Sequence, residues 1–139
     1  RAYVLADCTV QGVGPLAWAQ AAIMAMQDYG GDRLVAEVNQ GGALVENVLR
    51  QVDPLVPYKP LHASHGKSAR AEPVAALYEQ GRVHHLPGLG ALELQMSQMT
   101  PQGYRGGGSP DRLDALVWAL HDLIITPASL VLRPRLRVL

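Results

Sequence analysis

The sequence predicts an α/β domain of three layers, in which helices cover both faces of a largely parallel sheet. Short apolar runs alternate along the chain with longer segments of helical character, an order typical of such folds. Gly and Pro residues separate most of these segments. The run RLVAEVN is apolar and bounded by turn residues, as expected of a strand buried on both faces. Ligands of such sheets bind at the carboxyl ends of the strands, so candidate site residues are sought there.

The first half of the chain predicts three strands and two helices. The strand candidates are residues 2–6, 33–38 and 58–63. The helix candidates are residues 14–29 and 43–52. Pro15 suits a first helical turn, and Gly30 starts a strong stop signal. Pro60 places the third strand near a sheet edge, because proline cannot donate to the ladder of backbone hydrogen bonds.

The second half predicts a polar loop, further helices and one strand. The polar loop is HASHGKSARAEP, and the glycine-rich loop PQGYRGGG is flexible. The helices are expected at 72–81, within 87–100, and at 109–125, with a strand at 82–86. In the last helix, Ser109 is a good N-cap and Pro110 a good first helical residue. The tail that follows is extended or disordered and basic, with Arg133, Arg135 and Arg137.

Composition excludes several classes of protein. The chain has 139 residues, 48% of them hydrophobic and 17% charged, which suits one globular domain. The net charge is zero, so a nucleic-acid surface has to come from local clusters of basic residues. Cys8 is the single cysteine, which excludes an internal disulfide and favours a reducing compartment. There is no apolar run of roughly 18 residues and no signal-peptide pattern, so we expect a soluble intracellular protein.

Three carboxylates stand out. Glu37 interrupts the apolar run near the carboxyl end of its strand, and it either functions there or pairs with an arginine. Asp111 falls in a first helical turn, where the helix dipole alone stabilises it. Asp114 lies one turn further on, and at about 100° per residue it shares a face with Asp111, Trp118 and His121. The alternative for Asp114 is a solvated stripe on the helix.

Carboxylates that converge at strand ends and a helix start form a hard oxygen site of the kind that Mg²⁺ and Mn²⁺ favour. Two such metals about 3.5–4 Å apart support phosphodiester cleavage. Basic residues near the predicted loops offer phosphate contacts, although from spacing alone an ordinary solvated loop explains them better. They are Lys59, Lys67, Arg70, Arg82 and Arg105. The histidines lack a zinc pattern, no nucleotide-binding glycine motif is present, and the Met and Trp positions fit a core.

Three segments in this order and spacing resemble one family. They are VAEVNQGGALVENVLRQV, HASHGKSARAEPVAALYEQGRVHH and GGGSPDRLDALVWAL. Residues 2–127 resemble the C-terminal nuclease domain of the large terminase subunit of tailed bacteriophages and gene transfer agents. The resemblance implies a ribonuclease H-like and RuvC-like fold, with a central mixed sheet flanked by helices. It implies a bacterial cytoplasmic setting and cleavage of concatemeric double-stranded DNA with Mg²⁺ or Mn²⁺ at a two-metal site. The implied partners are a packaging ATPase domain of the same chain, the capsid portal and the small terminase subunit.

The resemblance also implies roles for individual residues. Glu37 matches the acid on the strand after the first helix, and Asp111 matches the acid at the start of the last helix. Many members have His-Asp-Asp where this chain has Ser109-Pro110-Asp111. Asp114 matches a further aspartate one turn later, as a ligand or a supporting carboxylate. Lys67 falls where members carry a basic residue, and a phosphate role extends to Arg70 and Arg105.

One family position has no match. The first catalytic aspartate belongs to a strand that would precede AYVLADC, and Asp7 lies too far along to replace it. We therefore expect an N-terminally truncated nuclease-like domain at 1–127, followed by the basic tail at 128–139, with impaired metal binding and cleavage. The alternatives are a non-catalytic module of the same fold that holds DNA or docks on the portal, and a junction resolvase.

Overall fold

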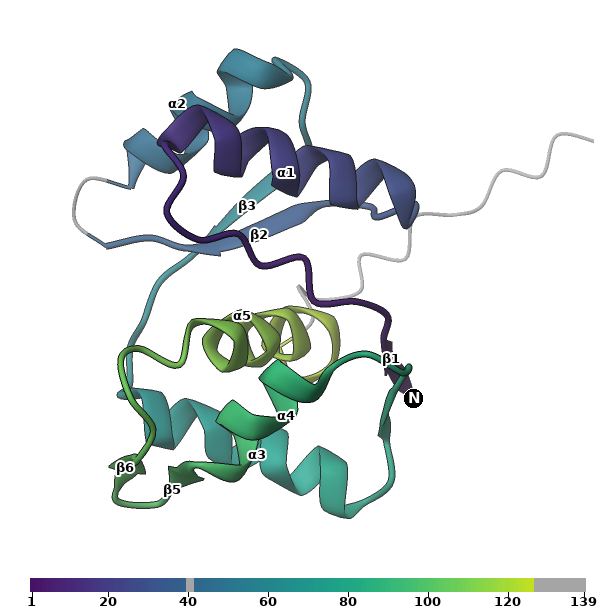
Figure 1. Cartoon of the computed structure of the whole chain (residues 1–139), viewed down its shortest axis with the longest axis vertical. Coiled ribbons are helices and arrows are strands. Elements are labelled where there is room, and N and C mark those ends of the chain that lie inside the picture. The colour runs from purple at the N-terminus through teal and green to yellow at the C-terminus, as the bar shows by residue number, and fades with distance from the viewer. Residues whose placement is uncertain (40–41, 127–139) are drawn as a thin grey trace, which may run out of the picture.

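Strands and helices alternate along the chain, as the sequence predicts. The computed structural model describes residues 1–39 and 42–126. The strands are β1 (Ala2–Val4), β2 (Leu34–Glu37), β3 (Tyr58–Leu61), β4 (Val83–His85), β5 (Met99–Thr100) and β6 (Gly103–Tyr104). The helices are α1 (Pro15–Asp28), α2 (Ala43–Val52), α3 (Lys67–Glu79), α4 (Gly90–Ser97) and α5 (Asp111–Leu120), and α5 continues into a π-helical turn, η1 (His121–Ile125). Figure 1 shows their arrangement. The predicted basic tail lies outside the described residues.

The strands of the described part form three separate pairs. Strands β1 and β4 are parallel, β2 and β3 are parallel, and β5 and β6 form a short antiparallel hairpin. Leu34 lies opposite Tyr58 and Glu37 opposite Leu61, so the carboxyl ends of β2 and β3 meet at one edge. The parallel pairing is as predicted. In the described residues the helix-flanked sheet consists of small two-stranded sheets, with the two parallel pairs in different ones.

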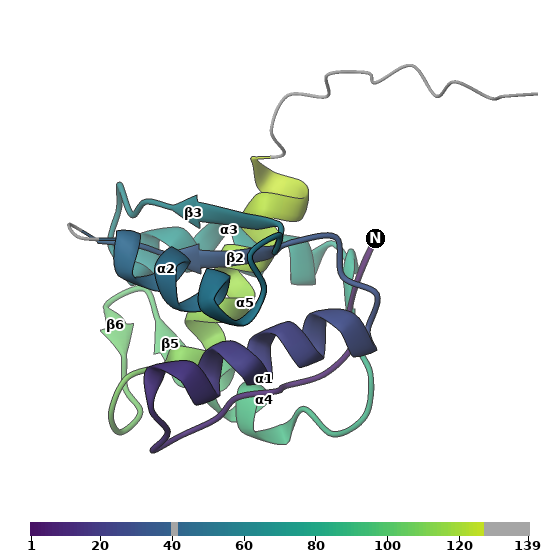
Figure 2. The same cartoon turned by 90° about the horizontal axis from the view of Figure 1, so that it is seen from above.

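Helices cover both faces of the β2–β3 pair (Figures 1 and 2). Helices α1 and α2 lie on one face and α5 on the other. Leu34 packs into the cluster formed with α1 and α2, whereas Glu37, three residues on, contacts α5. This matches the alternation of side chains along a strand. The predicted three-layer arrangement is therefore present around β2, and the Glu37 side chain points toward α5.

Two hydrophobic clusters stabilise the fold. The cluster around α1 and α2 contains Ala19, Ile23, Val48, Leu49 and Val56. The cluster beneath α5 joins β1, β4, α3 and α4, and contains Ala2, Val74, Leu77, Val83, Leu92, Leu113, Leu116, Val117 and Leu120. Helix α5 thus has one face in the second cluster and another against β2. None of the helices in the described ranges is long and apolar enough to span a membrane.

Helix α3 begins earlier than the sequence predicts. We expected a loop until Glu72, but the helix starts at Lys67 and contains Pro73. The first turn closes through the N–H of Arg70, which donates to the Gly66 carbonyl at 3.0 Å. Proline inside a helix removes one backbone hydrogen bond. The Arg70 side chain in this first turn packs on Trp118 of α5, a tertiary contact that could not be predicted from local signals.

Two smaller predictions were also wrong. Pro110, not Ser109, occupies the N-cap position of α5, and no side chain caps this helix. The Ser109 hydroxyl instead accepts a hydrogen bond from Lys67. The end of the helix predicted within 87–100 forms β5 instead, and it pairs with β6 in the predicted loop; the Thr100 hydroxyl donates to the Gly103 carbonyl at 2.8 Å.

Asp122 fastens the end of the last helix to the β2–β3 pair. It lies in η1 with 6% of its side chain exposed. Its Oδ2 accepts a hydrogen bond from Arg33 Nε at 2.7 Å, and its Oδ1 accepts one from Lys59. Arg33 precedes β2 and Lys59 belongs to β3, so one carboxylate ties three elements together. Lys59 therefore makes an internal ion pair, where the sequence suggested a phosphate contact.

Candidate functional site

The predicted site residues gather on one side of the molecule. The carboxyl end of β2 and the amino ends of α3 and α5 all lie on the left in Figure 1. Glu37 ends β2, Lys67 begins α3, and Asp111 begins α5. Strand ends and helix starts meet at such an edge in α/β folds, which is why the sequence analysis sought site residues there.

Glu37 is held by two residues of neighbouring helices. Its Oε2 accepts a hydrogen bond from the indole Nε1 of Trp118 at 3.0 Å. The Arg70 Nη2 lies 3.8 Å from the same oxygen. The Glu37 side chain is 30% exposed, so it lies at the rim and not in the core. Its orientation therefore depends on α5 and α3.

Arg70 is a buried cation. Its side chain is 8% exposed, and its guanidinium carbon lies 4.7 Å from the centre of the Trp118 ring. Its Nη1 donates to the His65 carbonyl at 2.5 Å, whereas its buried Nε has no hydrogen-bond partner among the described residues. These contacts are internal. The position of Arg70 does not support the prediction that it contacts DNA.

Asp114 pairs with Lys67. The Lys67 Nζ lies 2.5 Å from Asp114 Oδ2, and the Asp114 side chain is 16% exposed. The same ammonium donates to the Ser109 hydroxyl at 3.2 Å. Asp114 is thus not part of a solvated stripe. It forms an ion pair that links α5 to α3. Asp111, one turn earlier, is exposed, and so is Arg105.

The described residues do not complete a metal site. Carboxylate oxygens are the right donors for Mg²⁺ or Mn²⁺. However, residues 1–39 and 42–126 contain no group of three or more His, Cys, Asp or Glu side chains placed to hold a metal ion. The structure instead places a cation of α3 beside each of two predicted ligands, Arg70 beside Glu37 and Lys67 beside Asp114.

Asp7 forms an ion pair with Arg112 near the start of α5. Its Oδ2 accepts a hydrogen bond from Arg112 Nε at 2.7 Å, and its Oδ1 accepts one from the Thr9 backbone N–H at 3.0 Å. Burial tends to raise the pKa of Asp7, but the hydrogen bonds from Thr9 and Arg112 outweigh it and lower the pKa. The carboxylate stays charged and ties the segment after β1 to the start of α5.

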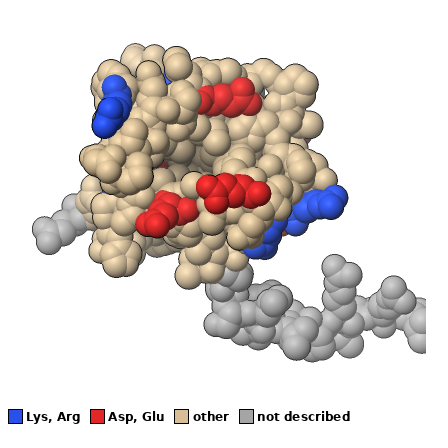
Figure 3. Space-filling model, turned by 90° about the horizontal axis from the view of Figure 1, so that it is seen from below, with Lys and Arg blue, Asp and Glu red and all other residues tan. Residues whose placement is uncertain are grey.

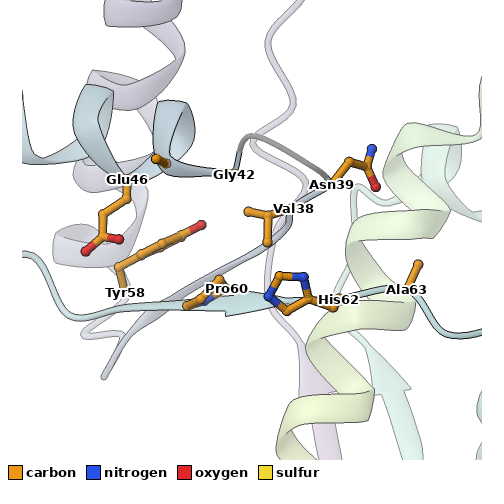
Figure 4. A pocket seen from close by; sticks show the side chains of 9 residues that line it. Val38, Asn39, Gly42, Glu46, Tyr58, Pro60, His62 and Ala63 are labelled. Atoms are coloured by element: carbon orange, nitrogen blue, oxygen red, sulfur yellow. The ribbon is translucent and has the colours of Figure 1, made fainter.

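Two clefts flank this region. The first, of about 770 Å³, lies at the carboxyl ends of β2 and β3 and is lined by Val38, Glu46, Tyr58 and His62 among others (Figure 4). Val38 alternates with Glu37 along the chain, so this cleft opens on the α2 side of β2, away from Glu37. None of the predicted catalytic residues lines it.

The second cleft, of about 650 Å³, lies between α3 and the β5–β6 hairpin. Lys67, Ser68, Thr100 and Tyr104 contribute to its walls. It begins at the amino end of α3, beside the Lys67–Asp114 pair. Figure 3 shows the molecule from the side where α3 and the hairpin lie, with separate acidic groups and basic side chains at opposite margins. A continuous basic band, which would track a DNA backbone, is not visible on this face.

The histidine pair after β4 has structural contacts. His85 Nε2 lies 2.6 Å from the Tyr78 hydroxyl, and its Nδ1 lies 2.9 Å from Glu93 Oε1. Burial, together with the negative charge of Glu93, raises the pKa of Tyr78 to about 12. Tyr78 therefore stays protonated and can donate to the imidazole. This network joins α3, β4 and α4.

Trp118 is the site residue that sequence reasoning missed. Its position on a helix suggested a core residue, and it is 9% exposed. The sequence signal for Trp118 was its position on the same helical face as Asp114. A buried indole N–H needs an acceptor, and the polar acceptor available on that side is Glu37.

A family model matches most of the chain. A family model described as a terminase RNaseH-like domain matches residues 1–123. No curated protein and no solved structure matches the chain. The match covers every described strand and helix up to the middle of η1, including the end of β2 and the whole of α3 and α5. The chain therefore belongs to the family of terminase RNaseH-like domains.

Proposed function

We propose that this domain is the metal-dependent endonuclease module of a viral DNA-packaging terminase, and that it cuts concatemeric double-stranded DNA. The observation that carries the proposal is the position of Glu37 at the carboxyl end of β2, with its carboxylate directed at α5. Asp114 and Asp111 lie on that helix, one turn apart. Family membership supports a nuclease-type module.

In this proposal Glu37, Asp111 and Asp114 are the acidic residues of the site. Mg²⁺ or Mn²⁺ would activate a water molecule and stabilise the leaving oxygen. Lys67 and Arg105 are exposed and serve as contacts to the phosphate backbone. The proposed setting is the bacterial cytoplasm, with a packaging ATPase domain, the capsid portal and the small terminase subunit as partners.

A second candidate has its own support. Glu37 and Asp114 each have a cation beside them, which reduces the need for a metal ion to neutralise the acids. An RNaseH-like domain in this state could hold DNA or dock on the portal without cleaving. The two candidates differ in one property, the dependence of DNA cleavage on a divalent cation.

Cleavage of supercoiled plasmid separates the candidates. We expect the purified chain to produce nicked and linear DNA with Mn²⁺, and none with EDTA. Because the described residues do not complete a metal site, we expect the rate to be low, so the assay uses protein in excess over plasmid. A chain that retards the plasmid in a gel but leaves it intact at every Mn²⁺ concentration would support the DNA-holding module instead. A chain that neither binds nor cuts would contradict both.

A further inference from the structure

We propose that the outward face of the β1–β4 pair binds single-stranded DNA. Tyr3 and His84 stack on its bases. Arg1 and Arg82 contact its phosphates. This inference goes beyond the proposed function, because β1 lies at the right in Figure 1 and the candidate cleavage site at the left. None of the four residues belongs to that site, and binding at this face needs no metal ion.

The pairing of β1 with β4 brings the four residues together. Tyr3 lies opposite His84. Arg1 and Arg82 are neighbours as well, because the Ala2 N–H donates to the Arg82 carbonyl at 2.8 Å. Side chains alternate between the two faces of a strand, and Ala2 is buried in the cluster beneath α5. The residues on either side of it therefore point outward.

Tyr3 and His84 form an exposed aromatic stack. Their ring centres lie 5.2 Å apart, and their planes are 26° from parallel. Tyr3 is 58% exposed, and His84 is exposed too. The stack uses one face of each ring and leaves the other to a base, since unpaired bases stack on tyrosine and histidine rings. Leu5 and Leu86 follow on the same face and extend it with exposed apolar surface.

Arg1 and Arg82 supply the positive charge of this face. Both are exposed, and neither forms an ion pair with an acid of the described residues. Most of the other Lys and Arg side chains in that part of the chain are paired. Like charges on neighbouring strands repel each other. A phosphate between them relieves the repulsion and accepts hydrogen bonds from the guanidinium groups.

The aromatic stack favours single-stranded over double-stranded DNA. The bases of a duplex are already stacked on one another, and a side chain reaches their faces only when they are unpaired. Arginine contacts phosphates in either form of DNA and carries no sequence information. The arginines therefore provide affinity, and the aromatic rings provide the preference for an unpaired strand.

Fluorescence anisotropy with a labelled oligothymidylate of about 12 nucleotides tests this proposal, in EDTA so that metal-dependent cleavage plays no part. Tyr3→Ala should weaken binding by about 5–150-fold, the loss typical of removing an aromatic ring from a stacked base. Tyr29→Ala is the matched control, because Tyr29 is 52% exposed and stacks on no other ring among the described residues. It should bind as tightly as the wild type does. Melting temperatures show whether each variant is folded.

The salt dependence of binding tests the arginines separately. On a single strand, each neutralised phosphate adds about 0.7 to the slope of log affinity against log salt concentration. Arg82→Gln should therefore reduce the magnitude of this slope by about 0.7. Tyr3→Ala removes no charge and should leave the slope unchanged. An unchanged slope in Arg82→Gln would contradict the phosphate contact.

Two further results would overturn the proposal. One is a wild type that does not bind the oligonucleotide, or a folded Tyr3→Ala variant that binds it equally well. The other concerns the same oligonucleotide annealed to its complement, for which Tyr3→Ala should have the affinity of the wild type. An equal loss of affinity for the duplex and the single strand would show that Tyr3 does not stack on unpaired bases.

Discussion

Replacing Glu37 with glutamine is expected to reduce Mn²⁺-dependent plasmid cleavage to background, a loss of more than about 100-fold. Removing a group that only orients a ligand costs about 10–100-fold, so removing the ligand's charge should cost more. Glutamine keeps the size of the side chain and can still accept the Trp118 hydrogen bond. The loss would therefore report the missing negative charge and not a change of shape.

Glu46→Gln is the matched control. Glu46 lies on α2, pairs with Arg50 at 2.9 Å and lines the cleft on the other face of β2 (Figure 4). Its replacement should leave cleavage unchanged. Melting temperatures of both variants show whether each is folded. Equal cleavage by a folded Glu37→Gln variant and the wild type would contradict the assignment of Glu37.

Asp122→Asn is expected to lower the free energy of unfolding by about 3 kcal/mol, the low end for breaking a buried ion pair. The low end applies because Arg33 and Lys59 are 43% and 34% exposed and water can solvate them in the variant. The carboxylate itself is almost fully buried, and asparagine cannot satisfy both cations. Urea unfolding at neutral pH measures the difference.

The same variant should change the pH dependence of stability. Burial tends to raise the pKa of Asp122, but hydrogen bonds and the charges of Lys59 and Arg33 outweigh it and lower the pKa below 3.8. A lowered pKa in the folded state means that the stabilisation is complete above the unfolded value. It is lost as pH falls through the folded value. The wild type should therefore lose its advantage over Asp122→Asn in acid. A constant difference down to pH 2 would contradict this account.

Local signals predicted most elements of the fold. Helix α2 spans the predicted residues 43–52, and β2 lies within the apolar run that predicted it. The predicted start of α3, after the polar loop, was wrong, because the helix begins at Lys67. This helix includes Arg70, whose packing on Trp118 joins residues 48 positions apart in the sequence. Contacts at such separations leave no periodic trace.

The candidate site was predicted in part. The shared face of Asp114 and Trp118 follows from helical spacing, and the structure confirms it, since both side chains contact cations of α3. Those cations could not be identified from spacing, because Lys67 and Arg70 lay in a segment that was predicted as a solvated loop. The sequence predicts Trp118 as a core residue, and it is buried. The same side chain also donates a hydrogen bond to Glu37, a second role that burial does not reveal. The metal-ligand roles of Glu37, Asp111 and Asp114 stay predictions.

The central claim is that Glu37 binds a divalent cation together with an acid of α5. Crystals of the chain soaked in Mn²⁺ test it most directly, because anomalous scattering locates the metal. We predict a peak within bonding distance of the Glu37 carboxylate, with Asp111 or Asp114 as a further ligand. A map with no peak at Glu37, in which Arg70 and Lys67 still neutralise Glu37 and Asp114, would contradict the claim.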